Sequence, residues 1–128
     1  MRAMLSYDYC ILRVVPSVER EEFVNAGVVL HCPEAAFLDC RLHIDEARWR
    51  ALSPSIDAAL VRQHLEAFPK ICAGDADAGP IASLSRRERF QWLAAPRSTM
   101  IQVSPVHSGM TADPPATLEE IFGRLVRA

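Results

Sequence analysis

The chain has 128 residues, of which half are hydrophobic and 23% are charged. This length and balance are typical of one globular domain with a real core, and they exclude a disordered chain. The formal net charge of -2 argues against a protein that binds nucleic acid through its overall charge. We expect one domain over residues 1–128. We also expect it to be cytoplasmic, because no apolar leader or membrane span is recognisable, with its four cysteines as reduced thiols.

Three strands are expected in the first third of the chain. Residues 7–15 are rich in aromatic and branched side chains and end at Pro16. Residues 26–32 form a second apolar run that ends at Pro33. Residues 37–44 alternate apolar and polar side chains, which is typical of a strand with one buried face. The few residues between the second and third strands suit a hairpin turn.

The stretch VEREEFVNAGVVLHC, residues 18–32, changes from charged to apolar halfway along. The default interpretation is a turn, because Asn25 and Gly27 tolerate a positive φ and allow a helical turn to become a strand. The alternative is a polar recognition cluster of Arg13, Glu22 and Asn25 at one end of the sheet. An arginine inside an apolar strand needs a partner or water, and an ion pair between Arg13 and Glu22 would satisfy it equally well.

Helical patterns follow the three strands. Asp45 is expected to cap a short helix, and Ser53 with Pro54 is a typical start for a longer helix that Pro69 ends. Residues 72–82 are small, acidic and glycine-bearing, so a mobile surface loop is expected there.

The last third alternates helix and strand signals. Residues 85–88, Ser-Arg-Arg-Glu, form a capping box that opens a helix. Residues 99–104 are expected to be a fourth strand and residues 105–116 a loop. Residues 117–120 form a second capping box before an amphipathic helix. The order β-β-β-α-α-α-β-α predicts an α+β fold, an antiparallel sheet of about four strands with three to four helices packed on one face.

Four side chains of the types that bind zinc fall in the predicted hairpin: His31, Cys32, Cys40 and His43. Their spacing matches no zinc knuckle, and strand alternation sends Cys40 and His43 to opposite faces. The cysteines fit better as small hydrophobic residues. We therefore expect no metal site and no cofactor.

Residues 85–97 concentrate arginines around Trp92, which favours phosphate or base contacts if these side chains are exposed. The simpler interpretation is an amphipathic helix with solvated arginines. His107, in a proline-bounded segment, is the best isolated candidate for a functional histidine. Glu22 and Asp39 are the only carboxylates that we place near one another for acid–base chemistry, and no catalytic motif is present.

Four short motifs occur together: Arg-Val-Val-Pro at 13–16, Asn-x-Gly-Val at 25–28, Ala-Pro-Arg-Ser at 95–98 and Pro-Val-His-x-Gly at 105–109. In this combination the chain resembles, over nearly its whole length, a bacterial family known as domain of unknown function 3037. The resemblance assigns no catalytic role. The candidate binding residues that it implies are Arg13, Glu22, Asn25, Arg97, Ser98 and His107.

Genes of that family often neighbour those of HipA-type serine/threonine kinases, so the resemblance implies a small partner or regulator of such a kinase. We therefore expect a non-catalytic binding or regulatory subunit that acts through a protein partner. One alternative is a nucleic-acid-binding protein or nuclease that uses residues 85–97. Another is a small-molecule-binding domain with its site between Arg13 and the segment that carries His107.

Overall fold

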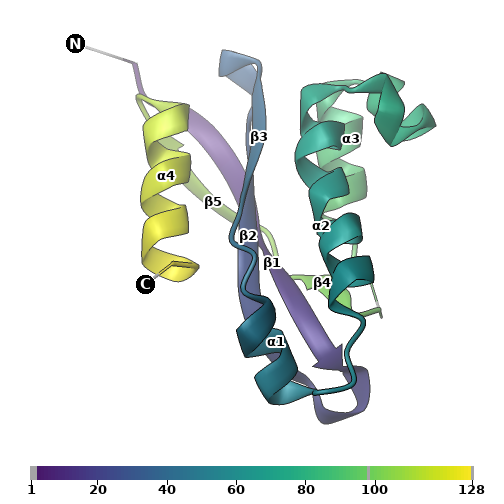
Figure 1. Cartoon of the computed structure of the whole chain (residues 1–128). Helices are drawn as coiled ribbons and strands as arrows, with labels where there is room; N and C mark the ends of the chain where they lie inside the picture. The colour runs from purple at the N-terminus through teal and green to yellow at the C-terminus, as the bar shows by residue number, and fades with distance from the viewer. Residues whose placement is uncertain (1–2, 98, 128) are drawn as a thin grey trace.

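The computed structural model describes residues 3–97 and 99–127, and these form an α+β fold (Figure 1). They contain five strands, paired antiparallel, and four α-helices in the order β-β-β-α-α-α-β-β-α. The predicted fold class is confirmed, with one strand more than expected. The strands are β1 (Leu5–Ser17), β2 (Glu22–Cys32), β3 (Phe37–Leu42), β4 (Ile101–Val103) and β5 (His107–Thr111), and the helices are α1 (Glu46–Leu52), α2 (Ala58–Ala73), α3 (Arg86–Leu93) and α4 (Pro114–Leu125).

Strand β1 occupies the centre of the sheet, in the order β3-β2-β1-β4. Strand β5 also pairs with β1, opposite residues 5–9, while β4 pairs with residues 12–14. Since β2 covers the other edge of β1, β4 and β5 follow one another along the same edge. Ser104 joins them: its N–H donates to the Ile11 carbonyl at 2.9 Å, and its hydroxyl accepts from the Ile11 N–H at 2.8 Å.

The extra strand β5 lies inside the predicted loop 105–116, so that loop prediction is wrong in part. The residues of β5 are His-Ser-Gly-Met-Thr, which lack the run of branched and aromatic side chains that marks a strand. Their strand conformation comes from pairing with β1, about a hundred residues earlier in the chain.

Helices cover both faces of the sheet, with α4 on one side and α1, α2 and α3 on the other (Figure 1). The expectation that all helices pack on one face is therefore wrong. The physical reason lies in β2, which is buried on both of its faces. Its residues Val24, Ala26 and Val29 face the core under α2, and Val28, Leu30 and Cys32 face the core under α4.

The apolar stripe predicted for the last helix is confirmed, and the stripe predicted for the longer helix (Ile56, Leu60, Val61, Leu65 and Phe68) is confirmed in part, because Leu60 is 40% exposed and Ile56 precedes α2. Leu118, Ile121 and Phe122 of α4 are buried in the smaller core, and α2 contributes a matching stripe to the larger one. None of the helices in the described residues is long and apolar enough to cross a membrane.

The ends of α2 differ from the prediction. The helix begins at Ala58 after the Asp57 carboxylate, which accepts the Leu60 N–H at 3.1 Å, and not at the Ser-Pro pair upstream. Pro69 lies inside the helix, which continues to Gly74 in the left-handed conformation (φ 72°). A proline removes one backbone hydrogen bond but does not end a helix whose following turn is held by tertiary contacts.

Those tertiary contacts come from Arg89 of α3. Its buried guanidinium donates to the carbonyls of Ile71 at 2.8 Å and Cys72 at 2.7 Å, in the last turn of α2. The predicted mobile loop 72–82 thus begins with the end of a helix, and its mobility stays a prediction. The segment then forms two short 3-10 turns, Ala76–Ala78 and Pro80–Ser83.

One of the two predicted capping boxes is confirmed. The Ser85 hydroxyl accepts from the Glu88 N–H at 3.2 Å and donates to the Glu88 carboxylate at 2.9 Å. The second box is wrong, because α4 begins earlier, at Pro114, and Asp113 provides its cap. The Thr117 hydroxyl instead pairs with a threonine hydroxyl at the end of β5.

In the charged-to-apolar stretch, residues 18–32, the chain reverses direction earlier than predicted. Val18–Arg20 forms a 3-10 turn, and Glu21 adopts the left-handed conformation (φ 60°) that reverses the chain. Asn25 and Gly27 lie inside β2, and neither has a positive φ. Glycine is required at 27 for another reason: a Cβ there would lie 2.7 Å from the Arg41 carbonyl oxygen of β3.

This packing predicts opposite effects at two glycines. Gly27→Ala should lower the free energy of unfolding by about 1–3 kcal/mol, because the added methyl overlaps backbone that cannot give way. Gly123 lies in α4 with open space around its Cα, so Gly123→Ala should raise the free energy of unfolding by about 0.5–1 kcal/mol. Urea denaturation of both variants measures the difference, and equal stabilities would contradict the close approach of β3 to Gly27.

Candidate functional site

The predicted cluster around Arg13 forms only in part. Arg13 lies opposite Asn25 in the β1–β2 ladder, and its guanidinium carbon lies 4.3 Å from the centre of the Phe23 ring. Asn25 donates to the Leu125 carbonyl at the end of α4, at 3.1 Å. Glu22 does not reach Arg13 and instead forms an ion pair with another arginine of the turn. The structure therefore joins two of the three predicted residues and explains Asn25 as a cap for α4.

Arg13 and Arg97 line the same cavity, of about 340 Å³, together with Glu21 and Gln102. Arg97 also caps α3, since its guanidinium donates to the carbonyls of Leu93 at 2.8 Å and Trp92 at 3.0 Å. Burial lowers the pKa of Arg97, although the guanidinium stays charged at neutral pH. Most of its hydrogen-bonding capacity is used inside the protein. Ser98, the next predicted binding residue, lies outside the described residues.

His107 lies apart from Asn25. It is exposed on β5 opposite Tyr9, and its ring centre is 5.3 Å from the Tyr9 ring. Arg13, which pairs with Asn25, lies four residues after Tyr9 along β1. At the rise of an antiparallel strand, this separates Arg13 from Tyr9 by about 13 Å. The strands β2 and β5 also flank opposite edges of β1, so His107 does not join Arg13 and Asn25 in one site.

The arginines of the α3 region divide into two pairs. Arg89 and Arg97 are used to tie down helix ends, and the guanidinium of Arg97 stacks 4.9 Å from the Trp92 ring centre. Arg86 and Arg87 are exposed, and neither makes a hydrogen bond or ion pair within the described part of the chain. The basic cluster that the sequence suggests is thus reduced to two free guanidinium groups.

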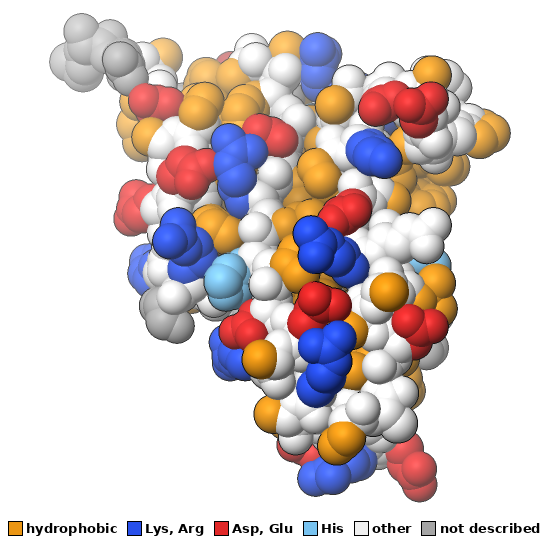
Figure 2. Space-filling model, viewed as in Figure 1, with side chains coloured by type: hydrophobic (Ala, Val, Ile, Leu, Met, Phe, Trp, Pro, Cys, Tyr) orange, Lys and Arg blue, Asp and Glu red, His pale blue; other side chains and the backbone are white. Residues whose placement is uncertain are grey.

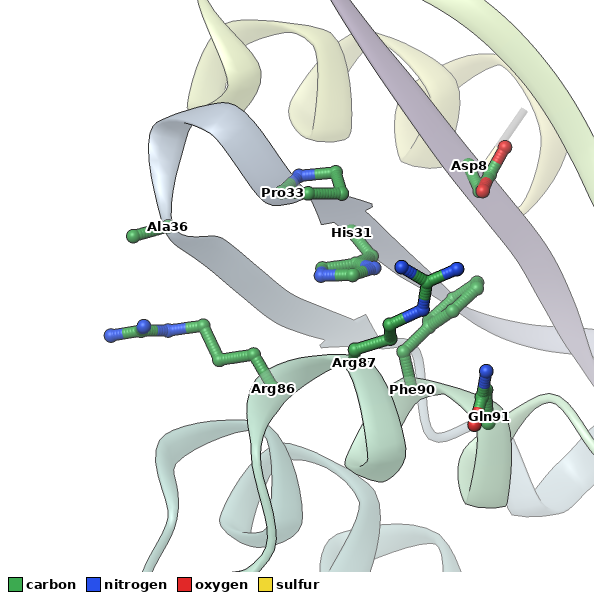
Figure 3. A pocket seen from close by; sticks show the side chains of 8 residues that line it. All are labelled: Asp8, His31, Pro33, Ala36, Arg86, Arg87, Phe90 and Gln91. Carbon is green, nitrogen blue, oxygen red and sulfur yellow. The ribbon is translucent and has the colours of Figure 1, made fainter.

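These two arginines border a cavity of about 410 Å³ between α3 and the sheet (Figure 3). Asp8 of β1 and His31 of β2 lie opposite one another in the ladder and line its sheet side. The His31 side chain is only 5% exposed, and its ring centre lies 5.2 Å from the Phe90 ring. The Asp8 carboxylate accepts the Ser108 hydroxyl of β5 at 2.5 Å.

Burial lowers the pKa of His31, while Asp8 raises it and Arg87, Arg86 and Arg89 lower it further. His31 is therefore mainly neutral at neutral pH, with one ring nitrogen free to accept a proton. Sequence reasoning weighed this histidine only as a zinc ligand and did not link it to Asp8. The available signal was a histidine within an apolar strand together with two arginines in the first turn of a helix.

The zinc hypothesis is not supported by the geometry, because Cys32 packs in the core under α4 and Cys40 in the core under α2. Within residues 3–97 and 99–127, no three His, Cys, Asp or Glu side chains gather closely enough to hold a metal ion. Glu22 and Asp39 are also far apart: Leu30, the partner of Asp39, lies eight residues along β2 from Glu22, about 27 Å. No acid–base pair forms there.

A comparison with protein families gives one match. The family described as protein of unknown function (DUF3037) matches residues 9–126. This chain belongs to the DUF3037 family. Searches of curated proteins and of solved structures gave no match. This match confirms the resemblance seen in the sequence motifs. The description of the DUF3037 family names no activity.

The two edges of the sheet in this DUF3037 protein differ in charge. At the β3 edge, Arg41 pairs with Asp39 at 2.9 Å and with Glu119 of α4. Charged side chains of this kind protect an edge against pairing with other strands. Strand β5 carries no Asp, Glu, Lys or Arg, and it pairs only with β1 among the described strands. Next to its unpaired edge, Val106 and Met110 are 46% and 56% exposed.

All four cysteines are buried as free thiols, and burial raises the pKa of Cys10 and of Cys72 to about 12. We expect the folded protein at pH 8 to react with a thiol reagent at least roughly 100-fold more slowly than the urea-unfolded chain, because the thiolate is the reactive form. Absorbance with Ellman's reagent measures both rates. Rapid labelling of one thiol in the folded protein would reveal an accessible nucleophile and contradict this expectation.

Proposed function

We propose that this protein is a non-catalytic binding subunit that acts through a protein partner, and that the partner adds a strand to the unpaired edge of β5. The observation that carries the proposal is the contrast between the two sheet edges. One edge is covered by the ion pairs of Arg41, while the other is uncharged and bordered by exposed apolar side chains. An unpaired edge offers backbone N–H and C=O groups to an extended segment of a second chain.

The exposed apolar side chains at this edge give such a partner something to bury. Met110 lies opposite Ser6 in the ladder, and Met4 lies two residues before Ser6, immediately ahead of β1. Met4 and Met110 are each 56% exposed. Methionine side chains adapt to different shapes and are common at surfaces that bind partner chains. The partner of this proposal is therefore an extended segment with apolar side chains on alternate positions.

Nucleic acid is the less favoured partner. Two of the four arginines of the α3 region are used within the protein, and Trp92 is covered in part by Arg97. On the face shown in Figure 2, acidic and basic side chains are interspersed. A protein that binds the phosphate backbone of a nucleic acid presents a contiguous stripe of basic side chains.

The first experiment is a tagged pull-down from the native host at physiological salt, with bound protein and nucleic acid both identified. The family resemblance makes a HipA-type serine/threonine kinase the first partner to test directly. A stoichiometric protein partner is the expected result. Recovery of the protein alone, or with nucleic acid only, would contradict the proposal.

Met110→Lys should weaken association with that partner by about tenfold or more, because a lysine at the edge blocks the approach of another strand. The matched control is Leu60→Lys on α2, which places the same charge on a side chain that is 40% exposed and far from β5 in the fold. Biolayer interferometry with the purified partner measures both variants. Equal weakening by the two changes would show that charge alone, and not the β5 edge, matters.

A further inference from the structure

The cavity between α3 and the sheet brings together basic and acidic side chains from distant parts of the chain. Its α3 side carries Arg86, Arg87 and Gln91, and its sheet side carries Asp8 and His31. Figure 3 shows Arg87 extending into the space between His31 and Asp8, while Arg86 extends in the opposite direction, away from His31. The volume of about 410 Å³ lies within the range of small-molecule sites.

The imidazole of His31 is buried yet makes no hydrogen bond within the described residues; its one ring contact is with Phe90. The ring borders the cavity, and its nitrogen atoms are not among the sealed polar atoms without a partner, so they are open to water or to a ligand in the cavity.

Arg86 and Arg87 add positive charge to a helix end that is already positive, with Glu88 as the acidic side chain of the same turn. Both lie in the first turn of α3, where the helix dipole is positive and favours acidic side chains. They also lie close enough to His31 to disfavour its protonated form. Asp8 opposes this effect from the sheet side, and an anion bound beside Arg87 and His31 would oppose it further.

We propose that this cavity binds a phosphorylated sugar, either free or as part of a nucleotide, with its phosphate held by Arg87 and His31 and with Arg86 at the cavity border adding positive charge. Arginine guanidinium groups hold phosphate through paired hydrogen bonds, which favours a phosphate over a single carboxylate at a site with two of them. The proposal is independent of the β5 edge.

The other lining residues recognise the uncharged part of the ligand. The Asp8 carboxylate accepts one hydrogen bond from Ser108 and has oxygen lone pairs left for a sugar hydroxyl. The exposed amide of Gln91 offers both a donor and an acceptor at the α3 side. A bare phosphate ion makes none of these contacts and should bind more weakly than a sugar phosphate.

Isothermal titration calorimetry at low salt tests the proposal with ribose 5-phosphate, adenosine monophosphate, ribose and inorganic phosphate. Saturable binding of at least one phosphorylated sugar, and none of ribose, is the expected result. Binding of the nucleotide but not of ribose 5-phosphate would identify the nucleotide as the source, and the converse would identify the free sugar phosphate. Failure of both to bind, or equally tight binding of inorganic phosphate, would overturn the proposal.

Two variants separate the cavity from general charge. Arg87→Gln should weaken binding by about tenfold, as expected for loss of a charged phosphate contact. Arg48→Gln, on the exposed surface of α1, removes the same charge elsewhere and should leave binding unchanged. Equal weakening by both variants would overturn the site. Because Arg87 is exposed, its replacement should leave the fold intact, which circular dichroism checks.

Proton NMR of the His31 ring gives a readout that a structural role would not change. A bound phosphate adds negative charge next to the ring, so the pKa of His31 should rise when the ligand saturates. Asp8 from β1 and Arg86, Arg87 and Arg89 from α3 face the ring in both states, so their effects cancel in the comparison. An unchanged His31 titration in the saturated protein would place the phosphate elsewhere.

Discussion

The structure depends on the pairing of β1 along both of its edges. Strand β2 covers one edge, and β4 and β5 follow one another along the other. With both edges paired, the two faces of β1 and β2 become the surfaces on which the helices pack. Fully buried residues such as Leu12 and Val14 each stabilise the fold by roughly 1.5–3 kcal/mol. The two cores are therefore separate, and a helix is needed on each face.

Arginine has two different roles around one short helix. Arg89 is buried and holds the last turn of α2, and Arg97 caps α3 and stacks on Trp92. Arg86 and Arg87 are exposed beside the cavity. Burial separates these roles, because a buried guanidinium must find acceptors within the protein, whereas an exposed one keeps its donors for water or a ligand. The amino-acid type alone does not reveal which role an arginine takes.

Much of the fold was predictable from local patterns. The alternation in β3, the hairpin turn between β2 and β3 and the Ser85–Glu88 capping box each depend on residues within a few positions of one another. The candidate binding residues predicted from the sequence do not come together in one site. Arg13 and Asn25 are neighbours, but Glu22 pairs with Arg20 and His107 lies on the far edge of β1. The cavity around His31 was missed because its lining comes from β1, β2, the turn after β2 and α3, which are not all adjacent in the sequence.

The sequence by itself determined the α+β class, the first three strands and the apolar stripe of the last helix, because strand and helix periodicity are properties of adjacent residues. Tertiary structure decided the position of α4 on the second face, the formation of β5 and the cavity beside α3. Asn25 bonds Leu125, and Ser108 bonds Asp8, each across a separation of 100 residues. Contacts over that distance depend on the register of the whole sheet, which no local pattern encodes.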